Sequence, residues 1–270
     1  MEYVYLLANT FILRPYVFVF LGISLYSGQQ LLGWRRAVRF FGLTWAIAFI
    51  CEYASTRIGI PFGDYFYTGS TQDHELYLSN IPFMDSISFS FLLYASYCLA
   101  LIFVLPPAKG VDQQGWLFDP ELRNSWPVVG LTVVLFTFSD VVIDPVALQG
   151  ERWFLGNIYG YHQEGIYFGV PLANFAGWAV VGFLSLLGFR LMERGTNATD
   201  PIPRMVVKWE LILGIGLYYG VLAFNLGMTF WIGEMLMGIV GSFIFVPLTA
   251  VLLNTLWRGL FAYRVKESSE

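Results

Sequence analysis

The chain of 270 residues is 57% hydrophobic and only 13% charged, whereas about a quarter of the residues in a typical soluble domain are charged. This composition excludes an ordinary soluble protein and is typical of a chain that lies in lipid. The formal net charge is −4 and the arginines are scattered among loops, which argues against nucleic-acid binding. Cys51 and Cys98 each stand in an apolar run, so we expect neither a disulfide framework nor a thiolate metal site.

Seven apolar segments are long enough to cross a bilayer, which takes a helix of roughly 20 residues. The last two are separated by only a residue or two around Phe230 and Trp231, so the connection is either a tight turn or a broken helix. Totals of six or eight spans are also compatible with the sequence. We predict an all-α polytopic membrane bundle of about seven transmembrane helices, which forms a single domain over residues 1–270. The predicted spans are 4–27, 38–58, 86–105, 126–147, 167–191, 209–229 and 231–257.

The basic residues predict the orientation of these spans. With seven spans, 12 of the 15 lysines and arginines fall on connections at one side of the bilayer, and the positive-inside rule makes that side cytoplasmic. We therefore expect the N-terminus outside, the C-terminus in the cytoplasm, and the protein in the cell (plasma) membrane. The 12 residues are Arg35, Arg36, Arg39, Lys109, Arg123, Arg190, Arg194, Arg204, Lys208, Arg258, Arg264 and Lys266.

Glu52, Asp140, Asp144 and Glu234 lie within or at the ends of predicted spans, and all four are towards the non-cytoplasmic side. A charge in hydrocarbon costs at least about 2.5 to 3.5 kcal/mol on insertion scales, so such residues usually face a polar interior. Asp140 and Asp144 are four residues apart and project from one helical face. Two carboxyl groups so placed repel each other when both are ionised, which favours a protonated form that can act as an acid.

Arg14, within the first predicted span, has two interpretations. It either pairs with Glu52 or one of the aspartates to hold the helices together, or it takes part in a binding site. Two outer segments, residues 52–70 and 150–178, are rich in aromatic residues. An interfacial aromatic belt explains some of them, but interleaved glycines also fit a lid of tight turns over an apolar pocket.

Missing residue types narrow the chemistry. The chain has only two histidines, His74 and His162, which excludes di-iron membrane desaturases and hydroxylases that need many histidine ligands. No lysine lies inside a span as a retinal-binding protein requires, and no glycine-rich nucleotide motif is found. A single D-x-x-x-D makes metal-dependent prenyl transfer improbable. Acid and base chemistry by carboxyl groups, without a cofactor or a metal, remains.

Three segments, EYASTRIGIPFGDYFYT, SDVVIDPVALQGERWF and YFGVPLANFAGW, resemble the carotenoid biosynthesis protein family, which includes the bisanhydrobacterioruberin hydratases and the γ-carotene 1'-hydroxylases. The resemblance implies that water is added across the terminal C1=C2 double bond of an acyclic carotenoid end. A carboxylic acid would protonate C2, and a second carboxylate would orient the water that captures the tertiary cation at C1. The resemblance also implies a carotenoid substrate, membrane lipid around the protein and other enzymes of carotenoid biosynthesis as partners.

The candidate residues divide by role. Asp140 or Asp144 is expected to be the acid and Glu52 the residue that positions water, although these roles can be exchanged. Aromatic faces near a cation stabilise it, and polar side chains bind water. The candidates for binding are Arg14, Asp64, Tyr65, Trp153, Tyr167, Asn174 and Trp178.

Two alternatives stay open. A lycopene-type cyclase would use the same protonation but let an internal double bond capture the cation. A transporter or lipid-binding scaffold would use the carboxyl groups as proton relays or structural pairs.

Overall fold

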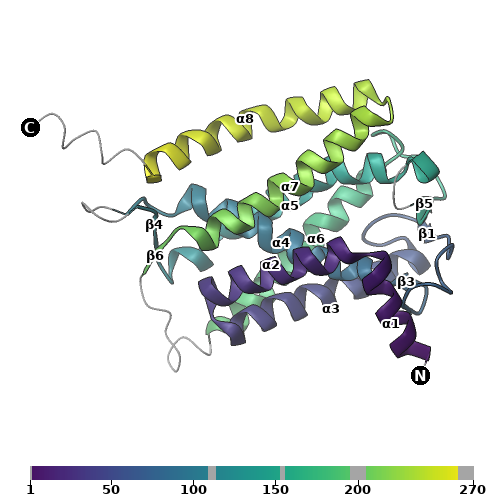
Figure 1. The fold of residues 1–270 in the computed structure, drawn as a ribbon, viewed down its shortest axis with the longest axis horizontal. Coiled ribbons are helices and arrows are strands. Elements are labelled where there is room, and N and C mark those ends of the chain that lie inside the picture. Colours follow the sequence, from purple (N-terminus) through teal and green to yellow (C-terminus); the bar gives the residue numbers. More distant parts are fainter. Residues whose placement is uncertain (1, 109–113, 153–155, 195–204, 261–270) are drawn as a thin grey trace, which may run out of the picture.

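The computed structural model describes residues 2–108, 114–152, 156–194 and 205–260. Its architecture is a helical bundle in which α4 is the most buried helix (Figure 1). The α-helices are α1 (Glu2–Leu13), α2 (Pro15–Leu32), α3 (Trp34–Ile58), α4 (Phe83–Val104), α5 (Trp126–Ala147), α6 (Leu172–Arg194), α7 (Trp209–Trp231) and α8 (Met235–Leu260). Short 3-10 turns lie at Leu122–Asn124 and Gly150–Arg152.

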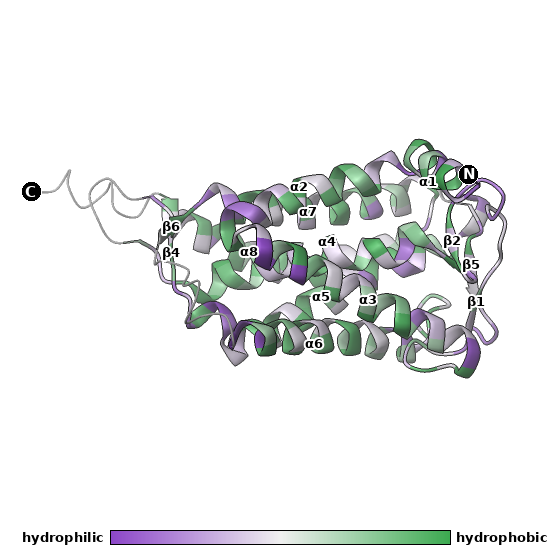
Figure 2. Ribbon diagram, turned by 90° about the horizontal axis from the view of Figure 1, so that it is seen from below, coloured by the Kyte–Doolittle hydropathy of each residue, from purple (hydrophilic) through white to green (hydrophobic). Residues whose placement is uncertain are grey.

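Six of these helices, α3 to α8, are long and apolar enough to cross a membrane, and the bent pair α1 and α2 raises the number to seven if it is one span. The prediction of an all-α polytopic bundle is therefore confirmed. Figure 2 shows that the helices are predominantly hydrophobic and that hydrophilic positions gather in the loops beside α1, β1 and β5. α1 and the last turn of α8 lie at opposite ends of the bundle (Figure 1). Which end faces the cytoplasm stays a prediction.

The first predicted span is not one straight helix. α1 and α2 meet at Arg14 at an angle of 87°, and Arg14 itself has φ −124° and ψ 50°, outside the helical region. Pro15 explains the break, because proline lacks an N–H and disfavours helical geometry in the residue before it. The prediction of a continuous segment over residues 4–27 is wrong at this point.

Two other boundaries follow from glycines. α6 begins at Leu172 rather than at 167, because residues 165–170 form a tight antiparallel turn with Gly165 opposite Gly169. A Cβ at Gly165 would lie 1.9 Å from a backbone carbon, so only glycine fits. α7 and α8 are joined by a turn in which Gly233 has φ 87°, which confirms the tight-turn alternative.

In the described part of the chain, three two-stranded ribbons cap the ends of the bundle. β1 (Tyr65–Tyr67) pairs antiparallel with β5 (Tyr159–Tyr161), with Tyr65 opposite Tyr161 and Tyr67 opposite Tyr159. β2 (Tyr77–Leu78) pairs with β3 (Ile81–Pro82), and β4 (Trp116–Phe118) pairs with β6 (Met205–Val207). The β1–β5 ribbon joins the two aromatic-rich outer segments and lies at the same end of the bundle as α1 (Figure 1).

Candidate active site

One wall of the candidate site is built from α5, α6 and β5 around Asp144. Asp140 and Asp144 lie one helical turn apart on α5 and are both buried. The Asn174 amide on α6 donates to both carboxyl groups, to Asp140 Oδ2 at 2.6 Å and to Asp144 Oδ2 at 2.7 Å. The hydroxyls of Tyr159 and Tyr161 donate to Asp144 at 2.7 and 2.9 Å. Asp144 therefore accepts three hydrogen bonds, which stabilise a carboxylate.

The opposite wall is built from α3, β1 and the first turn of α4. The Tyr67 hydroxyl oxygen lies 2.8 Å from Glu52 Oε1 and 2.6 Å from Asp85 Oδ2. Ser86 donates a further hydrogen bond to the other oxygen of Glu52. Glu52 is 2% exposed, so this carboxyl group interacts with protein rather than with bulk water.

The ribbon positions the tyrosine hydroxyls of both walls. Alternate residues of a strand point to one face, so Tyr65 and Tyr67 of β1 share a face, as do Tyr159 and Tyr161 of β5. The ring centroids of Tyr65 and Tyr161 are 6.1 Å apart, and those of Tyr67 and Tyr159 are 6.5 Å apart. Burial is the largest cause that raises the pKa of Tyr67, Tyr159 and Tyr161 well above the usual value for tyrosine. The phenols therefore keep their hydrogens at neutral pH and act as donors.

These groups enclose a small polar cavity of about 50 Å³. One water needs roughly 10 to 15 Å³ of such space and two to four polar partners, so the cavity has room for ordered water. Its lining residues are Glu52, Phe62, Tyr65, Tyr67, Asp85, Phe89, Asp144, Tyr159, Tyr161, Asn174 and Trp178.

A second cavity of about 450 Å³ adjoins the first and is predominantly apolar. It extends from the carboxyl groups between α2, α4, α5 and α7, past Phe20, Leu92 and Val221. Its size lies in the range of pockets that enclose small organic ligands. The two cavities share five lining residues: Asp85, Phe89, Asp144, Tyr159 and Trp178.

Aromatic rings line the region where the two cavities meet. Trp178 of α6 stacks on Phe89 with a centroid distance of 4.5 Å and contacts Phe136 at 4.6 Å. This packing fixes the indole ring beside the carboxyl groups. An aromatic face so placed can stabilise a cation that forms next to it.

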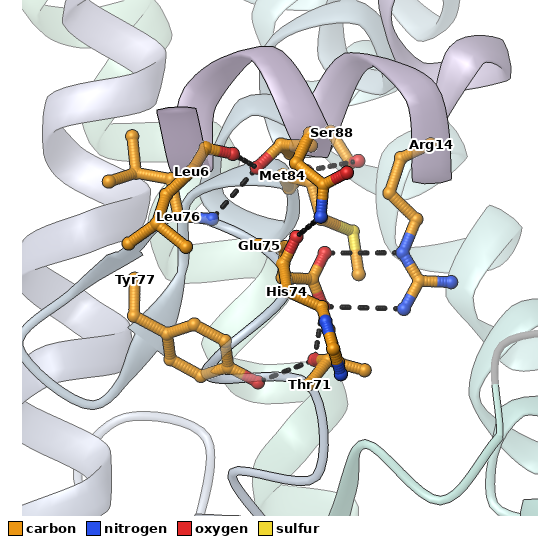
Figure 3. Close-up of polar contacts among 11 residues, drawn as sticks. Leu6, Arg14, Thr71, His74, Glu75, Leu76, Tyr77, Met84 and Ser88 are labelled. Atoms are coloured by element: carbon orange, nitrogen blue, oxygen red, sulfur yellow. Dashed lines mark hydrogen bonds and ion pairs between the residues drawn. The ribbon is translucent and has the colours of Figure 1, made fainter. Parts of the chain in front are cut away.

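Arg14 does not reach this site, because its guanidinium pairs with Glu75 (Figure 3). The two contacts measure 3.2 and 3.3 Å, and both side chains are buried. Thr71 also donates to Glu75. Arg14 therefore forms a buried ion pair, as its structural interpretation predicted, but the expected partners, Glu52 or an aspartate, were wrong.

Four other predicted residues lie away from the two cavities or outside the described part of the chain. Asp64 is 71% exposed and lies 3.9 Å from His162. Tyr167 packs against Phe168 and Phe175, and is not among the described residues that line either cavity. Glu234 pairs with Arg152 at 2.6 Å on the surface. Trp153 lies outside the described residues.

The sequence interpretation missed four polar residues of the site: Tyr67, Asp85, Tyr159 and Tyr161. Asp85 directly precedes the predicted span 86–105 and was therefore not counted with the carboxyl groups in spans. An acidic residue in the first turn of a helix is favoured by the helix dipole, and this signal would have found it. Among the described residues, no group of three or more His, Cys, Asp or Glu side chains is arranged to hold a metal ion.

Comparison with known proteins gives one match. The family model described as "Carotenoid biosynthesis protein" matches residues 1–248, which include every described residue of both cavities. No curated protein and no solved structure matches the chain. The chain is therefore a member of the carotenoid biosynthesis protein family.

Proposed function

We propose that this protein is a carotenoid hydratase that adds water to the terminal C1=C2 double bond of an acyclic carotenoid end. One observation carries the proposal: a carboxyl-lined polar cavity with room for water opens directly onto an apolar cavity of about 450 Å³. The apolar cavity suits the hydrocarbon end of a carotenoid. The polar cavity suits the water that must meet it.

The reaction needs an acid and a base at the junction of the two cavities. Asp85 and Asp144 line both cavities, so either carboxyl group can reach the substrate end. A carboxylic acid gives its proton to C2, the resulting cation at C1 is captured by water, and a carboxylate takes the proton that the water loses. Trp178 and Phe89 face the position of the cation and exclude bulk water from it.

Asp140 and Glu52 support these groups in the proposal. Asp140 is not among the described residues that line either cavity, and it shares the amide of Asn174 with Asp144. It therefore positions Asp144. Glu52 lines only the polar cavity, where it can hold water or a proton.

The polar cavity favours hydration over cyclisation. A cyclase must keep water away from the cation, so that an internal double bond captures it. Here nine of the described side chains that line the space next to the substrate cavity carry oxygen or nitrogen atoms. That lining would hold water against the cation rather than exclude it.

The experiment expresses the protein in a host that accumulates lycopene or γ-carotene and analyses the pigments by mass spectrometry. The wild type is expected to produce a carotenoid heavier by one water. Asp144→Asn should abolish this product, and Asp73→Asn, a control on the exposed loop, should leave it unchanged. An isomer of unchanged mass would instead show cyclisation, and unchanged pigments with several acyclic substrates would refute both reactions.

A further inference from the structure

Tyr67 has too few hydrogens for its two carboxyl neighbours. A neutral phenol carries one hydrogen and can donate it to only one acceptor, yet its oxygen lies 2.8 Å from Glu52 and 2.6 Å from Asp85. Both contacts are hydrogen bonds only if one of the two carboxyl groups is protonated and donates to the phenol oxygen. The geometry thus requires one acid proton on the unit formed by Glu52, Tyr67 and Asp85.

The positions of the carboxyl groups on their helices indicate where this proton rests. Asp85 stands in the first turn of α4, where the positive end of the helix dipole favours a negative charge. Glu52 lies in the C-terminal half of α3 and has no such support. The resting arrangement is therefore a protonated Glu52 that donates to Tyr67, which in turn donates to an ionised Asp85.

Asp144, in contrast to Glu52, is surrounded by hydrogen-bond donors. Its carboxyl oxygens accept hydrogen bonds from Tyr159, Tyr161 and Asn174, and these donors favour the carboxylate form. Arg14 does not neutralise this carboxylate, because its guanidinium is bound to Glu75 (Figure 3). The site thus pairs one carboxyl unit that holds a proton with one carboxylate that does not.

Building on the proposed function, we propose that Glu52, Tyr67 and Asp85 form a proton relay that delivers the acid proton to the carotenoid through Asp85, with Asp144 as the base. Glu52 transfers its proton to Tyr67, and Tyr67 transfers its own to Asp85. Asp85 then protonates C2 with the electron pair of the C1=C2 bond. Water bonds to C1 and loses a proton to Asp144, and water in the polar cavity returns that proton to the relay.

A test in D₂O separates the donor from the base. Purified protein in detergent micelles is incubated with lycopene, and both the hydrated product and the recovered lycopene are analysed for deuterium. A cation that is not captured loses a proton from C2 or a methyl group and becomes an alkene again, so repeated protonation labels the recovered substrate. Deuterium in lycopene therefore reports proton delivery even where hydration fails.

The relay predicts a different result for each wall. Asp85→Asn and Tyr67→Phe should lower both hydration and deuterium uptake roughly 100-fold or more, the usual contribution of a general acid. Asp144→Asn should abolish hydration but keep deuterium uptake. Tyr218→Phe is the matched control, because it removes a buried tyrosine hydroxyl that donates to the Leu135 carbonyl and is not among the described residues that line either cavity, and it should cost less than about tenfold.

The opposite pattern overturns the relay: deuterium uptake that survives in Asp85→Asn and disappears in Asp144→Asn makes Asp144 the donor. An equal loss in Tyr67→Phe and Tyr218→Phe overturns it as well, because the bridge would then have no special role. If Asp85→Asn elutes as an aggregate in gel filtration, Asp85→Glu is measured in its place. Deuterium uptake close to that of the wild type then supports proton delivery by this carboxyl group, and loss of deuterium uptake in a well-folded Asp85→Glu contradicts it. A wild type that hydrates no acyclic carotenoid refutes the proposed function itself, which these comparisons distinguish from a failure of the relay.

Discussion

The ion pair between Arg14 and Glu75 should determine whether α1 stays docked on the bundle. Glu75 is fully buried and accepts two contacts from Arg14 and one from Thr71. Arg14→Met removes the guanidinium but keeps much of the side-chain volume. It leaves a buried carboxyl group with a single donor. Breaking a buried pair from one side costs about 3 to 5 kcal/mol.

The distances of 3.2 and 3.3 Å exceed the roughly 2.7 to 2.9 Å of strong charge-assisted bonds, so we expect the lower end of that range, about 3 kcal/mol. The free energy of unfolding is measured by titration with SDS in mixed micelles. Arg14→Met/Glu75→Gln should recover part of the loss, because no buried charge is then left unpaired. A loss below about 1 kcal/mol for Arg14→Met, or no recovery in the double variant, would contradict this reasoning.

Three further predictions concern packing and the cavities. Gly177→Ala should destabilise the protein by about 1 to 3 kcal/mol in the same titration, because the new Cβ would lie 2.2 Å from Phe62. The control Gly216→Ala should be neutral or stabilising, because no atom lies within 4 Å of its new Cβ. Val221→Trp should fill the apolar cavity and lower hydration at least about tenfold without loss of folding, and unchanged pigment conversion would exclude this cavity as the substrate site. Asn174→Ala removes the amide that donates to both aspartates and should lower turnover more than lycopene affinity, whereas a change in affinity alone would contradict a role in positioning.

The sequence predicted the helices better than the site. Hydropathy places the spans because lipid demands about 20 apolar residues in a row, but it missed the bend at Pro15 and the glycine turn that delays the start of α6 to Leu172. The carboxyl groups Glu52, Asp140 and Asp144 were recognisable as charges in apolar segments, and the structure places them at one end of the bundle.

The partners of those carboxyl groups could not be predicted in the same way. Tyr67 and Tyr159 stand in loops where an aromatic belt explains tyrosines equally well. Their hydroxyls reach the carboxyl groups only because β1 pairs with β5, and such pairing between distant segments leaves no local pattern. Asp85 was missed because it lies directly before the predicted span 86–105 and not inside it.

The β1–β5 ribbon also sets the order in which the protein can become active. Its two strands are separated in the chain by α4 and α5, so the ribbon can close only after both helices have been synthesised and inserted. Contacts between distant segments carry the entropy of closing a long loop and form slowly. Insertion of the helices and assembly of the hydroxyl groups around the carboxyl groups are therefore separate events in folding, and activity should appear after the bundle itself has formed.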